Sequence, residues 1–317
     1  MPAKLLPVAS PDAKHAPDAL IWGLGAMASG CSNGLDTGFV ALGYGKVAVL
    51  GVVQGITELL PISSTAHMRI VPALLGWQDP GSAFSAVMQL AALAAVVSYF
   101  WADVRGLITG SLGALVRRDF SDKNFKFAMA IVVATIPIGI LGIALSKWLN
   151  ACGTSLRSLT VIGVSCVVMA VLLALAEVIA RHWKTVEQAS WRDAIVVGIA
   201  QAGALIPGVS RSGSTLTAAL FLGFKRDEAA RYSFLLGLPA IALAGLKELW
   251  ELRHAGLDNY GWSVLGLGLV VASISAFAAI WGLLRVMERF SAWPFVIYRA
   301  ALGAFLLTAV WLGILAN

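Results

Sequence analysis

The sequence predicts an all-α polytopic membrane protein with six transmembrane helices and two re-entrant helical hairpins in an inverted-topology repeat. Three observations lead to this prediction: the composition, a series of long apolar segments, and a pair of polar motifs that recur along the chain. The 317 residues are 59% hydrophobic and 13% charged, with a mean hydropathy of +0.82. Soluble domains carry about 25% charged residues. The composition therefore places the chain in a lipid bilayer.

Six segments are apolar over on the order of 20 residues, the length that crosses a bilayer as a helix. These segments are 82–101, 126–149, 158–180, 230–250, 262–284 and 295–316. Most of the 11 tryptophans lie at or just beyond the segment ends, where amphipathic rings favour the membrane interface. The tryptophans support the segment boundaries and hence six crossings.

Two further apolar regions are interrupted by Pro, Gly and hydroxyl residues. Each region is a pair of short runs, 45–60 with 64–75 and 193–206 with 212–223. Interrupted backbone is tolerated at membrane depth only where protein or a polar cavity satisfies its hydrogen bonds. We therefore expect two hairpins that enter the membrane and turn back.

The two interrupted regions share residues at a constant separation of 147 positions. Gly51, Gln54, Ser63, Leu75 and Gly76 recur as Gly198, Gln201, Ser210, Leu222 and Gly223. Three predicted crossings separate the regions, and an odd number inverts the second copy relative to the first. The polar tips of two hairpins that enter from opposite faces would then meet near the midplane and form one composite site.

This pattern predicts a single membrane domain over residues 44–317, preceded by an extension over 1–43. Within the domain, repeat one covers about 44–150 and repeat two about 191–317, with a linking helix at about 158–180. Cys31, Cys152 and Cys166 have neither metal-ligand spacing nor an even count, which argues against a zinc site or a disulfide framework.

Basic residues predict the orientation of the domain. Thirteen Lys and Arg fall in one set of loops and four in the opposite set, and the richer set is cytoplasmic by the positive-inside rule. The first hairpin would then enter from the outer side. Topology explains the net charge of +6, and no basic-aromatic module supports a nucleic-acid partner.

The first polar stretch holds an acid, an imidazole and several hydroxyls. Gln54 and Glu58 are four residues apart, so their side chains share one helix face. Ser64 and His67 are one helical turn apart, which suits either a nucleophile–base pair or a reactive His67. Two alternatives stay open: Glu58 is a structural buried acid, or it is functional. The hydroxyls of Ser63, Ser64 and Thr65 either only cap the next helix or also contact a ligand.

The second polar stretch places Arg211 among serines and glycines. A guanidinium can bind phosphoryl oxygens bidentately, while hydroxyl and N–H groups satisfy the remaining acceptors. The stretch therefore predicts a phosphate site, with a structural Arg211–Glu58 ion pair as the alternative. The position that answers Glu58 at the repeat separation is Leu205, so only one half keeps the acid.

Residues 51–67, GVVQGITELLPISSTAH, and 207–215, PGVSRSGST, resemble the two signature motifs of the undecaprenyl-diphosphate phosphatases of the bacitracin-resistance type. The resemblance covers roughly residues 44–316. It implies an enzyme of the bacterial plasma membrane that hydrolyses undecaprenyl diphosphate to the monophosphate carrier lipid at the outer face, in service of peptidoglycan synthesis, with a divalent metal, Mg²⁺ or Ca²⁺.

The same resemblance implies roles for individual residues. Glu58 and the residue at position 54 would organise the metal, and Ser64 and His67 would be the nucleophile or acid–base candidates. A further group would clamp the diphosphate: Arg211, Ser210, Ser212 and Thr215, with Ser63 and Thr65 as further binding candidates. Some family members have Glu where this chain has Gln54, so the chain supplies one carboxylate fewer. A Gln carbonyl still binds a hard cation that waters and phosphates complete.

A competing function is a lipid flippase or transporter of the polyprenyl phosphate carrier, because inverted repeats with broken helices at the midplane are common in secondary transporters. Translocation does not require a His–hydroxyl pair beside an acid, whereas phosphoryl hydrolysis uses all three groups. The sequence therefore favours the hydrolase. It leaves the oligomeric state open, with a homodimer as one alternative.

Overall fold

The structure is a computed structural model that describes residues 31–32, 35–145, 156, 158–315 and 317. The predicted extension over 1–43 lies largely outside the described residues, as do Cys152, the tryptophan Trp148, and two of the four basic residues counted in the less basic loops, Lys147 and Arg157. Apart from the antiparallel two-residue strands β1 (Cys31–Ser32) and β2 (Leu35–Asp36), the regular structure of the described residues is helical. The predicted all-α class is therefore confirmed.

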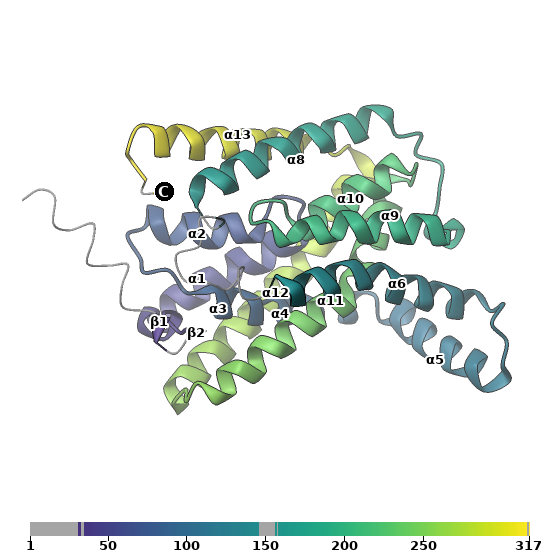
Figure 1. Cartoon of the computed structure of the whole chain (residues 1–317), viewed down its shortest axis with the longest axis horizontal. Helices are drawn as coiled ribbons and strands as arrows, with labels where there is room; N and C mark the ends of the chain where they lie inside the picture. Colours follow the sequence, from purple (N-terminus) through teal and green to yellow (C-terminus); the bar gives the residue numbers. More distant parts are fainter. Residues whose placement is uncertain (1–30, 33–34, 146–155, 157, 316) are drawn as a thin grey trace, which may run out of the picture.

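Figure 1 shows the helices of the described chain in their order. The α-helices are α1 (Phe39–Leu59), α2 (Ser64–Leu74), α3 (Ser82–Val87), α4 (Gln89–Tyr99), α5 (Trp101–Arg117), α6 (Lys123–Ala144), α8 (Leu159–Ile179), α9 (Trp191–Ala202), α10 (Arg211–Phe221), α11 (Arg226–His254), α12 (Asn259–Arg289) and α13 (Trp293–Trp311). Two 3₁₀ turns, η2 (Val186–Gln188) and η3 (Gly203–Leu205), precede α9 and follow it.

Seven helical stretches of the described chain are long and apolar enough to cross a membrane, whereas the sequence analysis expected six. The additional one is α1, which was expected only as a half-spanning run over 45–60. The helix begins at Phe39 because Phe39 and Leu42 are buried. Gly43, with φ of 71°, joins two helical pieces across a kink. The chain is therefore a multi-span membrane protein with one more candidate crossing than predicted.

The predicted segment 82–101 is also less regular than expected. It is divided into α3 and α4, which adjoin at Met88, and a further helix, α5, starts at Trp101. Sequence analysis missed α5 because its mixed apolar and basic composition gives no uninterrupted apolar run. The other five predicted segments correspond to α6, α8, α11, α12 and α13.

The short helices after the two polar turns have equivalent bounds in the two repeats. Helix α2 covers positions 64–74 and α10 covers 211–221, so both ends are displaced by 147. In Figure 1 the α1–α2 pair comes from the left and the α9–α10 pair from the right, and their turns face each other in the middle of the molecule. The two pairs thus approach each other from opposite ends.

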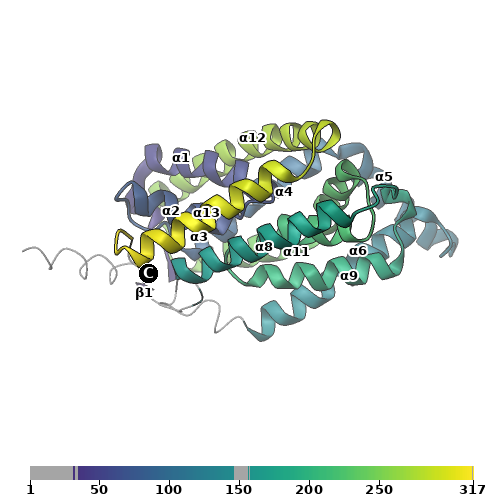
Figure 2. The same cartoon turned by 90° about the horizontal axis from the view of Figure 1, so that it is seen from above.

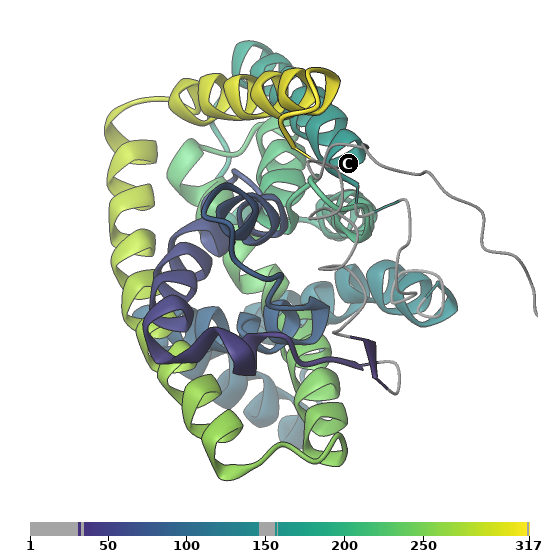
Figure 3. The ribbon, with the colours of Figure 1, turned by 90° about the vertical axis from the view of Figure 1, so that its left-hand side faces the viewer.

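Each first helix of a pair packs on a long helix of the other half of the chain. Helix α1 lies along α12, as Figure 3 shows, and α9 lies along α6. Glycine permits both contacts: a Cβ at Gly51 would lie 3.0 Å from the Gly268 carbonyl oxygen, and one at Gly198 would lie 2.5 Å from the Ala134 carbonyl oxygen. Helices α8 and α13 run side by side (Figure 2).

Candidate active site

The turns of the two helix pairs are joined by direct hydrogen bonds. The Gly208 amide donates to Thr65 Oγ1 at 3.3 Å. In the opposite direction, Ser212 Oγ lies 3.2 Å from the Glu58 carbonyl oxygen and 3.0 Å from that of Leu60. Motifs that lie about 150 residues apart in the sequence therefore form one cluster.

Both turns end in the same strained serine cap. Ser63 has φ of 73° and Ser210 has φ of 71°, a left-handed region that costs non-glycine residues on the order of 1 kcal/mol. Each side chain accepts a backbone N–H three residues on, from Ala66 for Ser63 and from Gly213 for Ser210. The caps start α2 and α10 with both N-termini, the positive ends of their dipoles, at the place where the turns meet.

Glu58 lies at the centre of this cluster, near the end of α1, and is 5% exposed. Its Oε2 accepts a hydrogen bond from Ser64 Oγ at 2.6 Å and one from Gln54 Nε2 at 3.0 Å. Its Oε1 lies 3.6 Å from Arg211 Nη2 of the other helix pair. One carboxylate thus contacts an amide, a hydroxyl and a guanidinium.

Arg211 is the positive partner of this carboxylate, and its donors are unused. Nε, Nη1 and Nη2 are all buried, and none of them has a hydrogen-bond partner among the described residues. The guanidinium lies against α11 at Gly237, where an added Cβ would fall 1.8 Å from Nη1. Buried donors normally have partners, so this arrangement fits an anion that supplies the acceptors.

His67 is held away from Ser64. Nδ1 is 2.7 Å from the Ser63 carbonyl oxygen, and Nε2 is 2.6 Å from the hydroxyl of Tyr298 on α13. Both ring nitrogens are therefore occupied, while Ser64 Oγ bonds to Glu58 instead. The nucleophile–base pair that the Ser64–His67 spacing suggested is not hydrogen-bonded in this structure.

The remaining hydroxyls of the two motifs all form bonds inside the cluster. Ser63 bonds to Thr65 and Ser210 to Ser212, in addition to the cap and cross-turn bonds described above. Thr215 bonds to the Arg211 carbonyl oxygen and to Ser233 on α11. These bonds fit the capping alternative for the hydroxyls, and ligand contacts by them stay a prediction.

Arg299 is a residue of the cluster that sequence reasoning missed. It is 1% exposed and donates hydrogen bonds to the carbonyl oxygens of Pro61 at 3.0 Å, Gly208 at 2.7 Å and Val209 at 3.0 Å. It therefore ties both turns to α13. The signal was present in the sequence, because an Arg inside the apolar segment 295–316 is costly at membrane depth without partners.

The donor set for a metal is small. Gln54 Oε1 is buried with no hydrogen-bond partner, and Glu58 is the adjacent carboxylate. Among the residues that the structure describes, no group of three or more His, Cys, Asp or Glu could hold an ion. The two oxygen ligands fit Mg²⁺ or Ca²⁺ only if substrate phosphates and waters complete the coordination.

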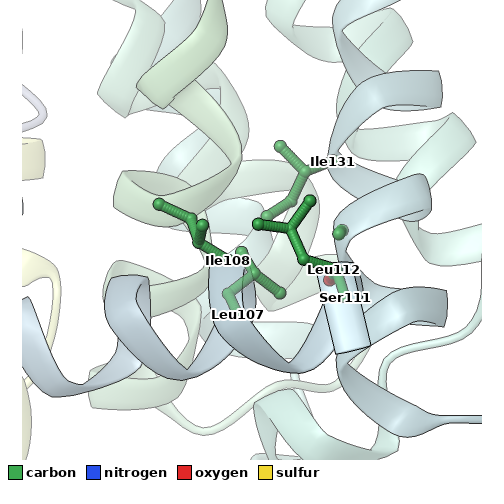
Figure 4. A pocket seen from close by; sticks show the side chains of 6 residues that line it. Leu107, Ile108, Ser111, Leu112 and Ile131 are labelled. Atoms are coloured by element: carbon green, nitrogen blue, oxygen red, sulfur yellow. The ribbon is translucent and has the colours of Figure 1, made fainter. Parts of the chain in front are cut away.

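A separate apolar pocket of about 280 Å³ lies between α5 and α6 (Figure 4). It is lined by Leu107, Ile108, Ser111, Leu112, Ala128 and Ile131. None of these residues belongs to either motif. The pocket is therefore unrelated to the cluster around Glu58.

The fold and the site together define a multi-span helical membrane protein with a buried carboxylate–hydroxyl–guanidinium site between two helix pairs. The family model described as bacitracin resistance protein BacA matches residues 47–305. The chain belongs to this family, as the resemblance of its two motifs predicted.

Relatives with curated names are similar over most of their length. Undecaprenyl-diphosphatase 2 of Mesorhizobium japonicum is 75% identical over 264 residues, which cover 83% of this chain and 100% of the relative. Undecaprenyl-diphosphatases of Synechococcus elongatus and Gloeobacter violaceus are each 48% identical, over 86% and 87% of this chain and 95% of each relative.

Proposed function

We propose that the chain is an integral-membrane phosphatase that hydrolyses undecaprenyl diphosphate to undecaprenyl phosphate and orthophosphate. The observation that carries this proposal is the contact of Glu58 with both Ser64 and Arg211. It places a polarised hydroxyl beside a guanidinium whose donors are unused. The names of the relatives, undecaprenyl-diphosphatase, agree with this chemistry. Hydrolysis would return the carrier lipid to peptidoglycan synthesis.

The geometry favours Ser64 as the nucleophile. Its hydroxyl already donates to Glu58 Oε2 at 2.6 Å, the distance at which a carboxylate can take the proton as general base. Ser64 Oγ would attack the terminal phosphorus, the proton would pass to Glu58, and undecaprenyl phosphate would leave. Water would then release orthophosphate from the phosphoserine and restore Ser64.

Arg211 and the helix N-termini would stabilise the phosphoryl group during this attack. Charge in phosphoryl transfer spreads over the equatorial oxygens, so catalysis depends on positioning and electrostatic stabilisation. Arg211 brings three buried nitrogens without hydrogen-bond partners in the described chain. The N-termini of α2 and α10 add partial positive charge where the turns meet.

His67 is the alternative nucleophile, and trapping the intermediate distinguishes the two. Substrate labelled on its terminal phosphate is mixed with enzyme and quenched, and the protein-bound label is tested in acid. A phosphoserine keeps its label in acid, whereas a phospho-histidine loses it. An acid-labile label that survives Ser64→Ala and disappears in His67→Ala would overturn the assignment of Ser64.

Mg²⁺ or Ca²⁺ is proposed as the cofactor. Gln54 Oε1 and the Glu58 carboxylate would hold it, and it would supply Lewis-acid neutralisation of diphosphate charge. Removal of divalent ions by a chelator should abolish phosphate release, and addition of Mg²⁺ or Ca²⁺ should restore it. Full activity in excess chelator would contradict this part of the proposal.

The topology that we propose is an inverted repeat with two re-entrant hairpins and a site open to the outer side of the plasma membrane. It is supported by the opposite approach of the two helix pairs and by their exchanged packing on α12 and α6. Single cysteines at Ser121 and Ala255, in a cysteine-free background, test the orientation. An impermeant thiol reagent applied to intact cells should label Ala255→Cys and not Ser121→Cys.

A flippase is the competing function, and one assay in micelles separates the two classes. Purified chain given farnesyl diphosphate and Mg²⁺ or Ca²⁺ should release orthophosphate, and Arg211→Ala should not. A flippase releases none, because it breaks no phosphoanhydride bond. The mass of the purified particle, measured in the same preparation, tests the homodimer that the sequence left as one alternative.

A further inference from the structure

Tyr298 is the one described side chain outside the two motifs that hydrogen-bonds to a motif imidazole. Its hydroxyl is 2.6 Å from His67 Nε2, and the two rings are nearly parallel, with centroids 5.6 Å apart and an interplanar angle of 10°. The residues are 231 positions apart. Tyr298 lies outside both motifs and takes no part in the proposed attack of Ser64.

The two hydrogen bonds of His67 determine which nitrogen carries the proton. Nδ1 faces the carbonyl oxygen of Ser63 at 2.7 Å, and a carbonyl oxygen only accepts. Nδ1 must therefore carry the hydrogen, and in the neutral ring the lone pair is on Nε2. It follows that the Tyr298 hydroxyl donates to Nε2.

The two partners of His67 come from different and rigid parts of the fold. Ser63 is the cap at the start of α2, four residues before His67, and its side chain accepts from the Ala66 N–H. Tyr298 precedes Arg299, which is bonded to the carbonyl oxygens of both turns. The imidazole is thus held between the first helix pair and α13.

The exposed fractions of His67 and Tyr298 differ. The imidazole residue is 8% exposed, whereas Tyr298 is 43% exposed. The hydroxyl end of the tyrosine meets the buried ring while much of the rest of the side chain faces outward. Tyr298 therefore covers the single basic nitrogen of His67.

We propose that Tyr298 is a positioning residue for the active site: its hydroxyl donates to Nε2 of the Nδ1–H tautomer that the Ser63 carbonyl oxygen selects, and it holds the imidazole in a fixed direction. This inference rests on the proposed function and on a part for His67 in phosphoryl transfer beside Ser64, without which a fixed imidazole would leave kcat unchanged. Tyr298 itself need not touch the substrate. Removal of its hydroxyl should leave Nε2 without a donor and free the ring to populate other orientations.

The test uses Tyr298→Phe, which removes the hydroxyl and keeps the stacked ring, and Tyr44→Phe as the matched control. Tyr44 also has a hydroxyl bonded at 2.6 Å, to Ser263, but lies outside the site. The ¹⁵N spectrum of histidine-labelled protein in micelles reports the tautomer of His67 and the hydrogen bond at its Nε2, assigned by comparison with His67→Asn. The measurement is made at a pH at which the imidazole is neutral.

We expect the ¹⁵N shift of a hydrogen-bonded Nε2 in the unmodified chain and in Tyr44→Phe, and the shift of an Nε2 without a donor in Tyr298→Phe. The loss of one hydrogen bond should lower kcat about fivefold to tenfold and change KM less than about twofold. Tyr298→Gln, whose amide can donate to the same nitrogen, should recover the hydrogen-bonded shift and part of the rate. Tyr298→Leu, which also lacks the donor, serves as the second variant if Tyr298→Phe does not fold.

Unchanged His67 nitrogen shifts in Tyr298→Phe would overturn the inference, and so would a changed Nε2 shift with an unchanged kcat. Failure of the proposed function looks different: the unmodified chain would release no orthophosphate. The spectrum would still report on the contact between Tyr298 and His67 in that case, so the two failures are distinguishable.

Discussion

The first helix pair, α1–α2, and the second, α9–α10, share their framework and differ in their chemistry. Both turns end in a serine with positive φ, at Ser63 and Ser210, and both second helices have the same length. The first pair carries Glu58 and His67, whereas the second carries Arg211 and has Leu205 in the place of the acid. The backbone geometry is thus duplicated, while the carboxylate of Glu58 and the guanidinium of Arg211 lie on opposite halves.

This difference explains why neither pair forms a site alone. Glu58 without Arg211 would be a buried carboxylate with only neutral partners, and Arg211 without Glu58 would be a buried unpaired cation, which is strongly unfavourable. Each charge is satisfied only where the pairs meet.

Removal of Arg211, the buried cation of the second pair, should have the largest effect. Arg211→Ala should lower kcat/KM for phosphate release by about 10³-fold or more, because it removes the donors that face the developing charge. Arg192→Ala is the matched control, since Arg192 lies on α9 of the same pair and is exposed. Orthophosphate release from farnesyl diphosphate measures both. Turnover of Arg211→Ala near that of the control would refute its role.

Removal of Arg299, the hydrogen-bond donor that joins the two turns, should mainly affect stability. Arg299→Ala leaves three buried carbonyl oxygens without a partner, so the free energy of unfolding should fall by about 2–5 kcal/mol. The midpoint of thermal unfolding in micelles should fall with it. Arg285→Ala, at an exposed position of α12, should change the midpoint little. Equal midpoints for the two variants would show that Arg299 does not join the turns.

The packing of the first helices should respond unequally to an added methyl group. Gly198→Ala places a Cβ 2.5 Å from a backbone oxygen and should destabilise by about 1–3 kcal/mol. Gly51→Ala, at 3.0 Å, should cost less. Gly139→Ala on α6 meets nothing within 4 Å and serves as the control. The midpoint of thermal unfolding should be lowest for Gly198→Ala, intermediate for Gly51→Ala and highest for Gly139→Ala. An unchanged midpoint for Gly198→Ala would contradict the close approach of α9 and α6.

Substitutions of the two glutamines at equivalent positions, Gln54 and Gln201, should have the smallest effects. Gln54 bonds to Glu58 and has an unpaired Oε1, whereas both amide atoms of Gln201 are buried without partners in the described chain. Gln54→Leu should raise the Mg²⁺ concentration for half-maximal activity about tenfold, a loss of ~1.4 kcal/mol. Gln201→Leu should leave this concentration unchanged and the midpoint equal or higher. Equal metal dependence of the two variants would remove Gln54 from the metal site.

Local features of this protein could be predicted from its sequence. The spacing of Gln54 and Glu58 predicted a shared helix face, and the hydrogen bond between them agrees. The separation of 147 located both turns and their serine caps. Such features depend on neighbours within a few residues, so the order of residue types is enough to specify them.

The exact crossing helices were less predictable. Helix α1 starts before its apolar run because Phe39 and Leu42 pack into the core, and this burial depends on distant helices. Helix α5 has too mixed a composition to resemble either a span or a loop. Apolar length alone therefore gave one candidate crossing fewer than the structure.

Sequence by itself determined the membrane class, the family and the residues that carry charge into the apolar interior, because composition and motif spacing are properties of the linear chain. Only the tertiary structure decided how these residues are paired. In the structure the Ser64 hydroxyl donates to Glu58 rather than to His67, and Tyr298 and Arg299 of α13 contact residues of the two turns and of α2. The reason is physical: a buried polar group bonds to whatever partner packing places within about 3 Å, and that partner can lie more than 200 residues away.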